Sequence, residues 1–156
     1  MLRKLQDLDP EDYQTLVNAL PMIAVLIGSA NEGYIEEKEI EASKRIAIIR
    51  SHSFDADLKE FYADVARDFT EKIQDIIDVT PRDKEQRQTF LSDELSKVTP
   101  VLSMLQEDLA VRLYASMKSF GYHTAQSSGG FLDYLSISPE EQALVDLEMI
   151  EFKSRI

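Results

Sequence analysis

The sequence predicts an all-α protein, a compact bundle of about six to seven helices in a single domain that spans residues 1–156. Apolar residues recur at helical spacing through most of the chain, whereas the alternating pattern of a strand is nowhere sustained. Four of the five glycines fall between these periodic segments, as short connections between helices require. Hydrophobic residues make up 44% of the chain, which is enough to form one core.

The first helix has a clear start signal. Asp9-Pro10 combines a favoured N-cap residue with proline at the first helical position, where no backbone N–H is needed. The first helix should therefore run from Pro10 to Gly28, with Pro21 kinking or splitting it. A second helix is predicted from about Glu36 to residues 51–53.

The third helix is the most regular of the sequence. Asp55 is its expected N-cap, and one continuous apolar stripe follows with charged residues opposite it. The stripe consists of Leu58, Phe61, Val65, Phe69, Ile73 and Ile76. A more polar fourth helix should start at Pro81 and end near Lys97.

The C-terminal third predicts two further helices. Pro100 should break or kink the chain before a helix that carries Leu105, Leu109 and Leu113 on one face. Its second face is also mostly apolar, with Val101, Met104, Val111 and Ala115. A helix that is apolar on two faces is expected at the centre of the bundle. After a loop or short helix over 121–137, a last helix should begin at Ser138.

The charge excludes several classes of partner. The chain has 29 acidic and 17 basic residues and a net charge of −12, which repels nucleic-acid phosphates and anionic membranes. No run approaches the ~20 apolar residues of a membrane span. The absence of cysteine excludes disulfides and thiolate metal sites and is typical of a reducing compartment. We therefore expect a cytoplasmic protein with a protein partner, a basic one being a candidate, and neither nucleic-acid binding nor membrane insertion.

Two stretches about a hundred residues apart share a layout and suggest two related halves. Residues 30–39 read Ala-Asn-Glu-Gly-Tyr-Ile-Glu-Glu-Lys-Glu, a glycine-containing turn before a helix start with a glutamate in its first turn. Residues 128–131 read Ser-Gly-Gly-Phe, and the helix start Ser-Pro-Glu-Glu follows at 138–141.

Both stretches resemble the TerB-like tellurite-resistance family, over nearly the whole chain from Leu16 to Phe152. That family has an Ala-Asp-Gly-x-Ile turn before a glutamate-bearing helix, and later a Ser-Gly-Gly-Phe loop before a Ser-x-x-Glu helix start. The resemblance implies a bundle of some seven helices, a role in bacterial stress response, no enzymatic activity and a metal-related role for acidic positions. Those positions fall on Glu32, Glu39 and Glu141, and Glu32 departs from the family's aspartate by one methylene.

Glu32, Glu36, Glu39 and Glu141 are therefore the candidate metal ligands, with a divalent cation as the one candidate cofactor. Hard cations such as magnesium and calcium take several oxygen ligands, and three of these carboxylates fall within eight residues. The alternative is a solvated helix start stabilised by the helix dipole. For Glu141, a capping box with Ser138 is a sufficient structural explanation.

Three functions remain open from the sequence. One is a TerB-like stress module with an acidic cation site, and another is a protein-interaction adaptor with no metal or small-molecule ligand. The third, a metal-dependent hydrolase, is disfavoured because the sequence carries no nucleophile elbow, phosphate-binding loop or dinucleotide-binding motif. No catalytic residues are predicted. The two histidines, His52 and His123, have no neighbouring partner at zinc-ligand spacing.

Overall fold

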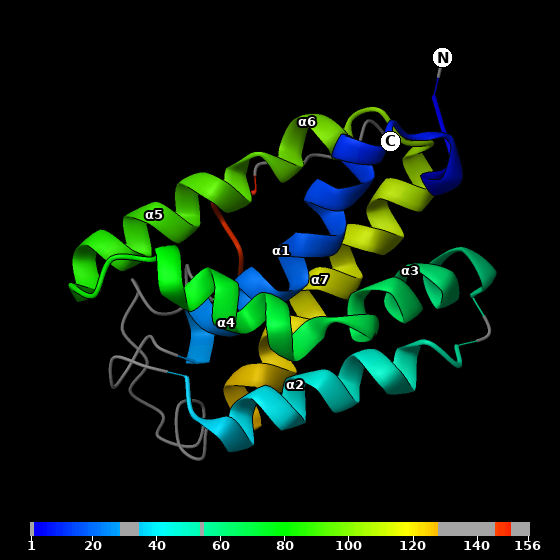
Figure 1. Ribbon diagram of the computed structural model, residues 1–156. Coiled ribbons are helices and arrows are strands. Elements are labelled where there is room, and N and C mark those ends of the chain that lie inside the picture. Colours follow the sequence, from blue (N-terminus) through cyan, green and yellow to red (C-terminus); the bar gives the residue numbers. More distant parts are fainter. Residues whose placement is uncertain (1, 29–34, 54, 128–145, 151–156) are drawn as a thin grey trace.

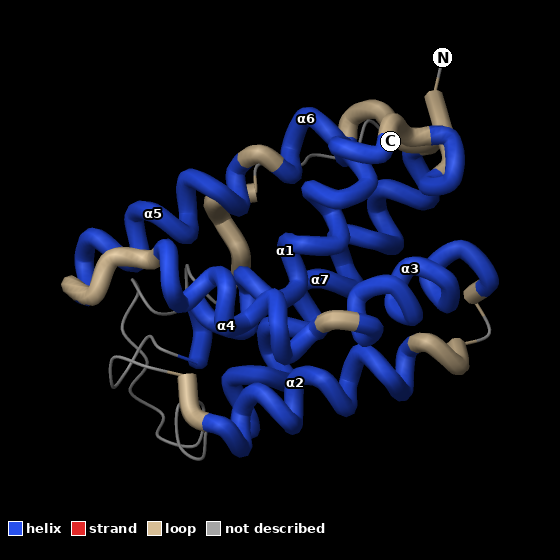
Figure 2. The backbone as a smooth tube through the Cα atoms, viewed as in Figure 1, coloured by secondary structure: helices blue, strands red, loops and turns tan. Residues whose placement is uncertain are grey.

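The computed structural model describes residues 2–28, 35–53, 55–127 and 146–150, and this part of the chain is a helical bundle (Figures 1 and 2). The prediction of an all-α fold is confirmed. No strand occurs in the described ranges, where Arg3 and Leu105 form only an isolated bridge. The elements are η1 (Leu5–Asp7), α1 (Pro10–Gly28), α2 (Glu37–Arg50), α3 (Ala56–Arg67), α4 (Phe69–Val79), α5 (Lys84–Ser96), α6 (Val98–Leu102) and α7 (Glu107–Ser127).

Helix α1 is the centre of the bundle and packs against each of α2 to α7 (Figure 1). Its second half is buried on all sides, and Leu16, Leu20 and Ile23 have no exposed surface. The prediction that the helix around Leu109 would be central is therefore wrong. The second face of α7 is open to solvent instead, since Val111 is 38% exposed and Ala115 is exposed as well.

Pro21 does not split α1, which is one helix from Pro10 to Gly28. A proline inside a helix removes one backbone hydrogen bond, and here the burial of the surrounding turns compensates for that loss. At the end of α1, Gly28 is needed for space. A Cβ atom placed on Gly28 would lie only 2.7 Å from Cγ1 of Ile35.

The long third helix of the sequence is two helices in the structure. Asp55 caps α3 as predicted, its side chain accepting from the backbone N–H groups of Asp57 and Leu58. The helix breaks at Asp68, whose backbone leaves the helical region, and α4 begins at Phe69. The apolar stripe nevertheless stays in one core, because the two helices keep their apolar faces toward α1.

Three predicted boundaries after α4 are wrong. Helix α5 begins at Lys84 rather than Pro81, because Asp83 provides the N-cap by accepting from the Gln86 N–H at 3.0 Å. Pro100 lies inside α6, and the break comes after Leu102. Gly121 also does not end α7, which continues to Ser127.

The start of the predicted last helix, at Ser138, lies outside the described residues. Residues 146–150, which that helix should include, form turns instead of a helix, and Leu147 has a positive φ of 53°. Of the C-terminal region, residues 146–150 are described, and Leu147 and Ile150 are buried in the common core. The Tyr114 hydroxyl of α7 donates to the Ile150 carbonyl at 3.1 Å, which holds this segment against the bundle. No helix among the described residues has the length and apolar character needed to cross a membrane.

Polar contacts tie α2 to its neighbours. The buried hydroxyls of Ser43 and Thr124 lie 3.2 Å apart across the α2–α7 contact. Arg50, at the end of α2, donates to groups on α3 and α7, among them the hydroxyls of Tyr62 and Ser119. These contacts fix the register of α2 along α7, which apolar packing alone specifies less strictly.

Candidate functional site

Two of the predicted metal ligands, Glu36 and Glu39, lie at the start of α2. Glu36 is the N-cap residue, and Glu39 Oε1 accepts from the Glu36 backbone N–H at 3.0 Å. Their i, i+3 spacing is therefore used in local capping of the helix. Glu39 is only 4% exposed, whereas the Glu36 side chain is half exposed and lies 3.5 Å from the ammonium of Lys38.

The other two predicted ligands, Glu32 and Glu141, lie outside the described residues, as does Ser138. The shared acidic site and the two related halves therefore stay predictions. Within the described ranges, no group of three or more histidine, cysteine, aspartate or glutamate residues is arranged to hold a metal ion. The described residues thus place two of the four predicted carboxylates at the start of α2.

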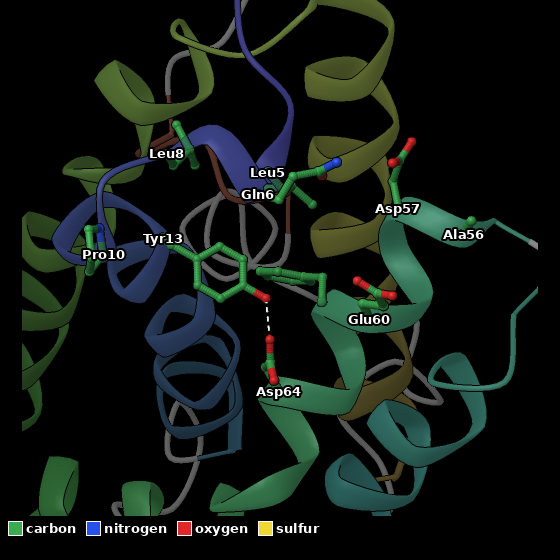
Figure 3. Close-up of a pocket in the computed structure, with 10 residues that line it drawn as sticks. Leu5, Gln6, Leu8, Pro10, Tyr13, Ala56, Asp57, Glu60 and Asp64 are labelled. Atoms are coloured by element: carbon green, nitrogen blue, oxygen red, sulfur yellow. Dashed lines mark hydrogen bonds between the residues drawn. The ribbon is translucent and has the colours of Figure 1, made fainter.

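A pocket of about 540 Å³ lies elsewhere, between the N-terminal segment and α3 (Figure 3). One wall comes from η1 and the first turn of α1, and the other from the first turns of α3. Its lining residues are Leu5, Gln6, Leu8, Pro10, Tyr13, Ala56, Asp57, Glu60, Phe61 and Asp64. None of these ten residues is basic.

The apolar part of the pocket is rigidly built. Leu5, Leu8 and Phe61 belong to the hydrophobic core and are 5%, 8% and 0% exposed. The Tyr13 ring stands edge-on to the Phe61 ring, with centroids 6.2 Å apart. This geometry is favourable for aromatic rings and fixes Tyr13 as a wall of the pocket.

The acidic part of the pocket comes from one face of α3. Asp57, Glu60 and Asp64 are three and four residues apart, a spacing that places side chains on the same helix face in successive turns. Figure 3 shows Glu60 between the two aspartates, with Tyr13 across from them. Three carboxylates therefore share one side of a partly apolar hollow.

The outer two carboxylates have cationic neighbours within the chain. Asp64 accepts from the Tyr13 hydroxyl and lies 3.0 Å from the guanidinium of Arg67. Asp57 lies 3.3 Å from the guanidinium of Arg112. For Glu60, by contrast, the described part of the chain provides no ion pair.

The Tyr13 phenol is held in its protonated form. Burial raises the pKa of Tyr13 well above its ordinary value, and the hydrogen bond to Asp64 and the charges of Asp64 and Glu60 raise it further. At neutral pH the tyrosine is therefore a neutral hydrogen-bond donor. The ionisable groups that line the pocket carry negative charge or none, which favours a cationic ligand.

The sequence reasoning missed this pocket, although half of its signal was present. The acidic spacing of Asp57, Glu60 and Asp64 can be read from the sequence, but charges opposite an apolar stripe are normally a solvated face. The opposite wall comes from residues 5–13, and nothing in the sequence indicates that this segment folds over α3. No protein-family model, curated protein or solved structure was found to match this chain.

Proposed function

We propose that the chain is a non-enzymatic, cytoplasmic TerB-like module that acts by binding a partner protein at the pocket between η1, α1 and α3. The observation that carries the binding proposal is the pocket itself. Its volume of about 540 Å³ falls within the roughly 300–1,000 Å³ that is usual for ligand sites. Support for the TerB-like assignment comes from the order of the two sequence motifs and from the all-helical bundle.

The chemistry of the pocket favours binding over catalysis. Its polar side chains are three carboxylates, the amide of Gln6 and the phenol of Tyr13. The raised pKa of Tyr13 keeps the phenol protonated, so the tyrosine is a poor base at neutral pH. Pro10, Tyr13 and Ala56 keep exposed surface in the lining and can contribute binding energy by burial. A mixed apolar and charged lining is typical of a recognition site.

Position-specific cross-linking tests this function. A diazirine amino acid is placed at Ala56, which is exposed and lines the pocket, and cross-linking is carried out in living cells that express the full chain. The control carries the same group at Glu85, an exposed residue of α5, on the other side of α1 from α3 (Figure 1). A third form combines the Ala56 cross-linker with Gln6→Trp, which fills the pocket without changing the charge.

We expect cross-linked protein species from position 56, none from position 85, and loss of the adduct in the Gln6→Trp form. The captured protein, once purified, should bind the parent chain with the same dependence on Gln6→Trp. Equal labelling from both positions, or an adduct that survives the filling of the pocket, contradicts the proposal.

A second candidate function is a divalent-cation site at the start of α2, as the TerB-like resemblance implies. Its support is the resemblance, which places Glu39 among the family's acidic positions, together with the neighbouring carboxylate of Glu36 at the same helix start. Calorimetric titration of the chelator-treated protein with calcium, magnesium, manganese and zinc tests it. Glu39→Gln keeps an oxygen that can cap the helix and removes the charge, and Glu41→Gln on the exposed face of α2 is the control.

An ion-dependent heat that disappears in Glu39→Gln but persists in Glu41→Gln would support the site. If none of the four ions gives a heat with the parent chain, the cation site is rejected. Binding at the α3 pocket is a separate matter, since neither Glu39 nor Glu41 lines that pocket.

A further inference from the structure

We propose that the pocket between η1, α1 and α3 recognises a basic segment of a protein, with a lysine or arginine side chain inserted so that its charged end meets Glu60. This inference rests on the proposed binding function and names the chemistry of the partner. The methylene stem of the inserted side chain lies against the partly exposed ring of Tyr13.

Glu60 is the carboxylate with which an external cation pairs. Asp57 lies 3.3 Å from an arginine guanidinium of the chain, and Asp64 lies 3.0 Å from another. The charges of these two aspartates are therefore partly neutralised. Glu60 lies between them, is exposed, and has no ion pair among the described residues. An incoming cation at Glu60 also gains from the two neighbouring carboxylates without displacing either arginine.

The apolar surface beside Glu60 selects a long amphipathic cation over a metal ion. Lysine and arginine carry several methylene groups below the charge, and these groups pack favourably on apolar surface while the charge stays in a polar environment. The ring of Tyr13 provides such a surface and can also contact the cation through its face. A single metal ion, with ligand distances of roughly 2–2.6 Å, gains nothing from it.

The size of the pocket indicates a peptide segment rather than a free amine. A volume of about 540 Å³ is comparable to that of sites for drug-sized ligands and exceeds what one side chain fills. The residues that flank the inserted side chain can occupy the remainder, beside Gln6, Pro10 and Ala56, which are exposed. The net charge of −12 adds long-range attraction for a basic partner and accelerates its association.

The probe for the test is a fluorescently labelled eight-residue peptide of alternating lysine and serine. Its matched control is the same peptide with every lysine acetylated, which keeps the stem and removes the charge. Binding to the full chain is followed by fluorescence anisotropy at low and physiological salt. We expect the lysine peptide to bind the parent chain with a dissociation constant at least ten-fold lower than that of the acetylated peptide.

Variants then locate the site. Glu60→Gln should weaken the lysine peptide by about three- to five-fold, the scale of one solvent-exposed ion pair. Glu85→Gln removes the same charge on α5 and should change affinity less than two-fold. Gln6→Trp fills the pocket and should weaken binding ten-fold or more. If Gln6→Trp lowers the urea midpoint of unfolding, Ala56→Leu replaces it as the filling variant.

Four results would overturn the inference: equal binding of the acetylated peptide, equal losses in Glu60→Gln and Glu85→Gln, no effect of pocket filling, or spermidine binding as tightly as the peptide with the same dependence on Glu60. The last result would identify a small polyamine as the occupant. These outcomes are distinct from failure of the proposed function. A pocket-specific cross-link at position 56 without lysine recognition would leave the interaction module in place with a partner of different chemistry.

Discussion

Arg50 ties α2 to both α3 and α7, and Arg50→Met is the perturbation that tests this connection. One terminal nitrogen donates to the Tyr62 hydroxyl at 2.8 Å and to the carbonyl and hydroxyl of Ser116 at 2.7 and 3.0 Å. The other donates to the Ser119 hydroxyl at 2.8 Å. The guanidinium carbon also lies 5.2 Å from the centre of the Tyr62 ring. All these acceptors are neutral, so the bundle depends here on hydrogen bonds rather than on an ion pair.

The expected loss of stability follows from these contacts. A hydrogen bond to a charged group contributes about 1.5–3 kcal/mol, but bonds that share one guanidinium are not additive. The hydroxyls of Tyr62 and Ser116 also contact each other and stay partly satisfied when the guanidinium is removed. Methionine keeps most of the apolar stem. We therefore expect Arg50→Met to lower the free energy of unfolding by about 2–3 kcal/mol.

The assay is equilibrium urea unfolding followed by circular dichroism. Arg45→Met is the matched control, because Arg45 is exposed on the same helix and its loss changes the net charge equally. Arg45→Met should cost less than about 0.5 kcal/mol. Arg50→Lys, which keeps the charge but not the fork of donors, should fall between the two. If Arg50→Met and Arg45→Met destabilise the chain equally, the reasoning about this cluster is refuted.

Four further predictions concern the core, a close approach and two titrating groups. Phe69→Ala, at a side chain that is 1% exposed, should cost about 3–5 kcal/mol in urea unfolding, and a loss below about 1 kcal/mol would contradict its core position. Gly28→Ala should cost about 1–3 kcal/mol because its Cβ meets Ile35, and adding Ile35→Ala should make the Gly28 change less costly if that contact is the cause. Burial raises the pKa of Asp55, but its ion pair and helix-capping hydrogen bonds lower it by more, so Asp55 titrates below its ordinary pKa of 3.8. Asp55→Asn should therefore cost up to about 1 kcal/mol of unfolding free energy at neutral pH. This cost should disappear as the pH falls through the lowered folded-state pKa, which urea unfolding at a series of acid pH values would show. Tyr13→Phe should lower the free energy of unfolding by about 1 kcal/mol at pH 7. Because the pKa of Tyr13 is raised in the folded state, the unfolded tyrosine ionises first, and this loss of stability should shrink as the pH rises above about 10. A loss that is the same from pH 7 to 11 would count against the raised pKa.

Local signals in the sequence predicted the first three helix starts, but neither the later starts nor the helix breaks. Glu36 and Asp55 mark starts because the groups that satisfy the first backbone N–H donors lie within three residues of them. Pro10 marks a start because the first helical position needs no N–H donor. The break at Asp68 has neither glycine nor proline, and Pro21 lies in an unbroken helix. In both places tertiary packing outweighs the local preference, and such packing cannot be read from neighbouring residues.

The candidate sites divide in the same way. The pair Glu36 and Glu39 was identified from its spacing, and its observed capping contact is equally local. The acidic face of α3 was visible in the sequence as well. The pocket was not, because it forms only when Tyr13 meets α3, and the Tyr13 hydroxyl that donates to Asp64 is 51 positions away in the chain. Without that contact, three carboxylates on a helix are indistinguishable from a solvated surface.

The amino-acid sequence by itself determined the all-helical class, much of the apolar stripe in the core and the first three helix starts, because hydrophobic periodicity and capping act over one or two turns. Only the tertiary structure decided that α1 is the central helix, that the stripe from Leu58 to Ile76 bends at Asp68, and that Arg50 reaches Ser116 and Ser119, more than sixty positions away. These features depend on which apolar faces meet. Many pairings of amphipathic helices bury similar area, so the choice among them depends on the shape and hydrogen bonding of side chains distant in the sequence.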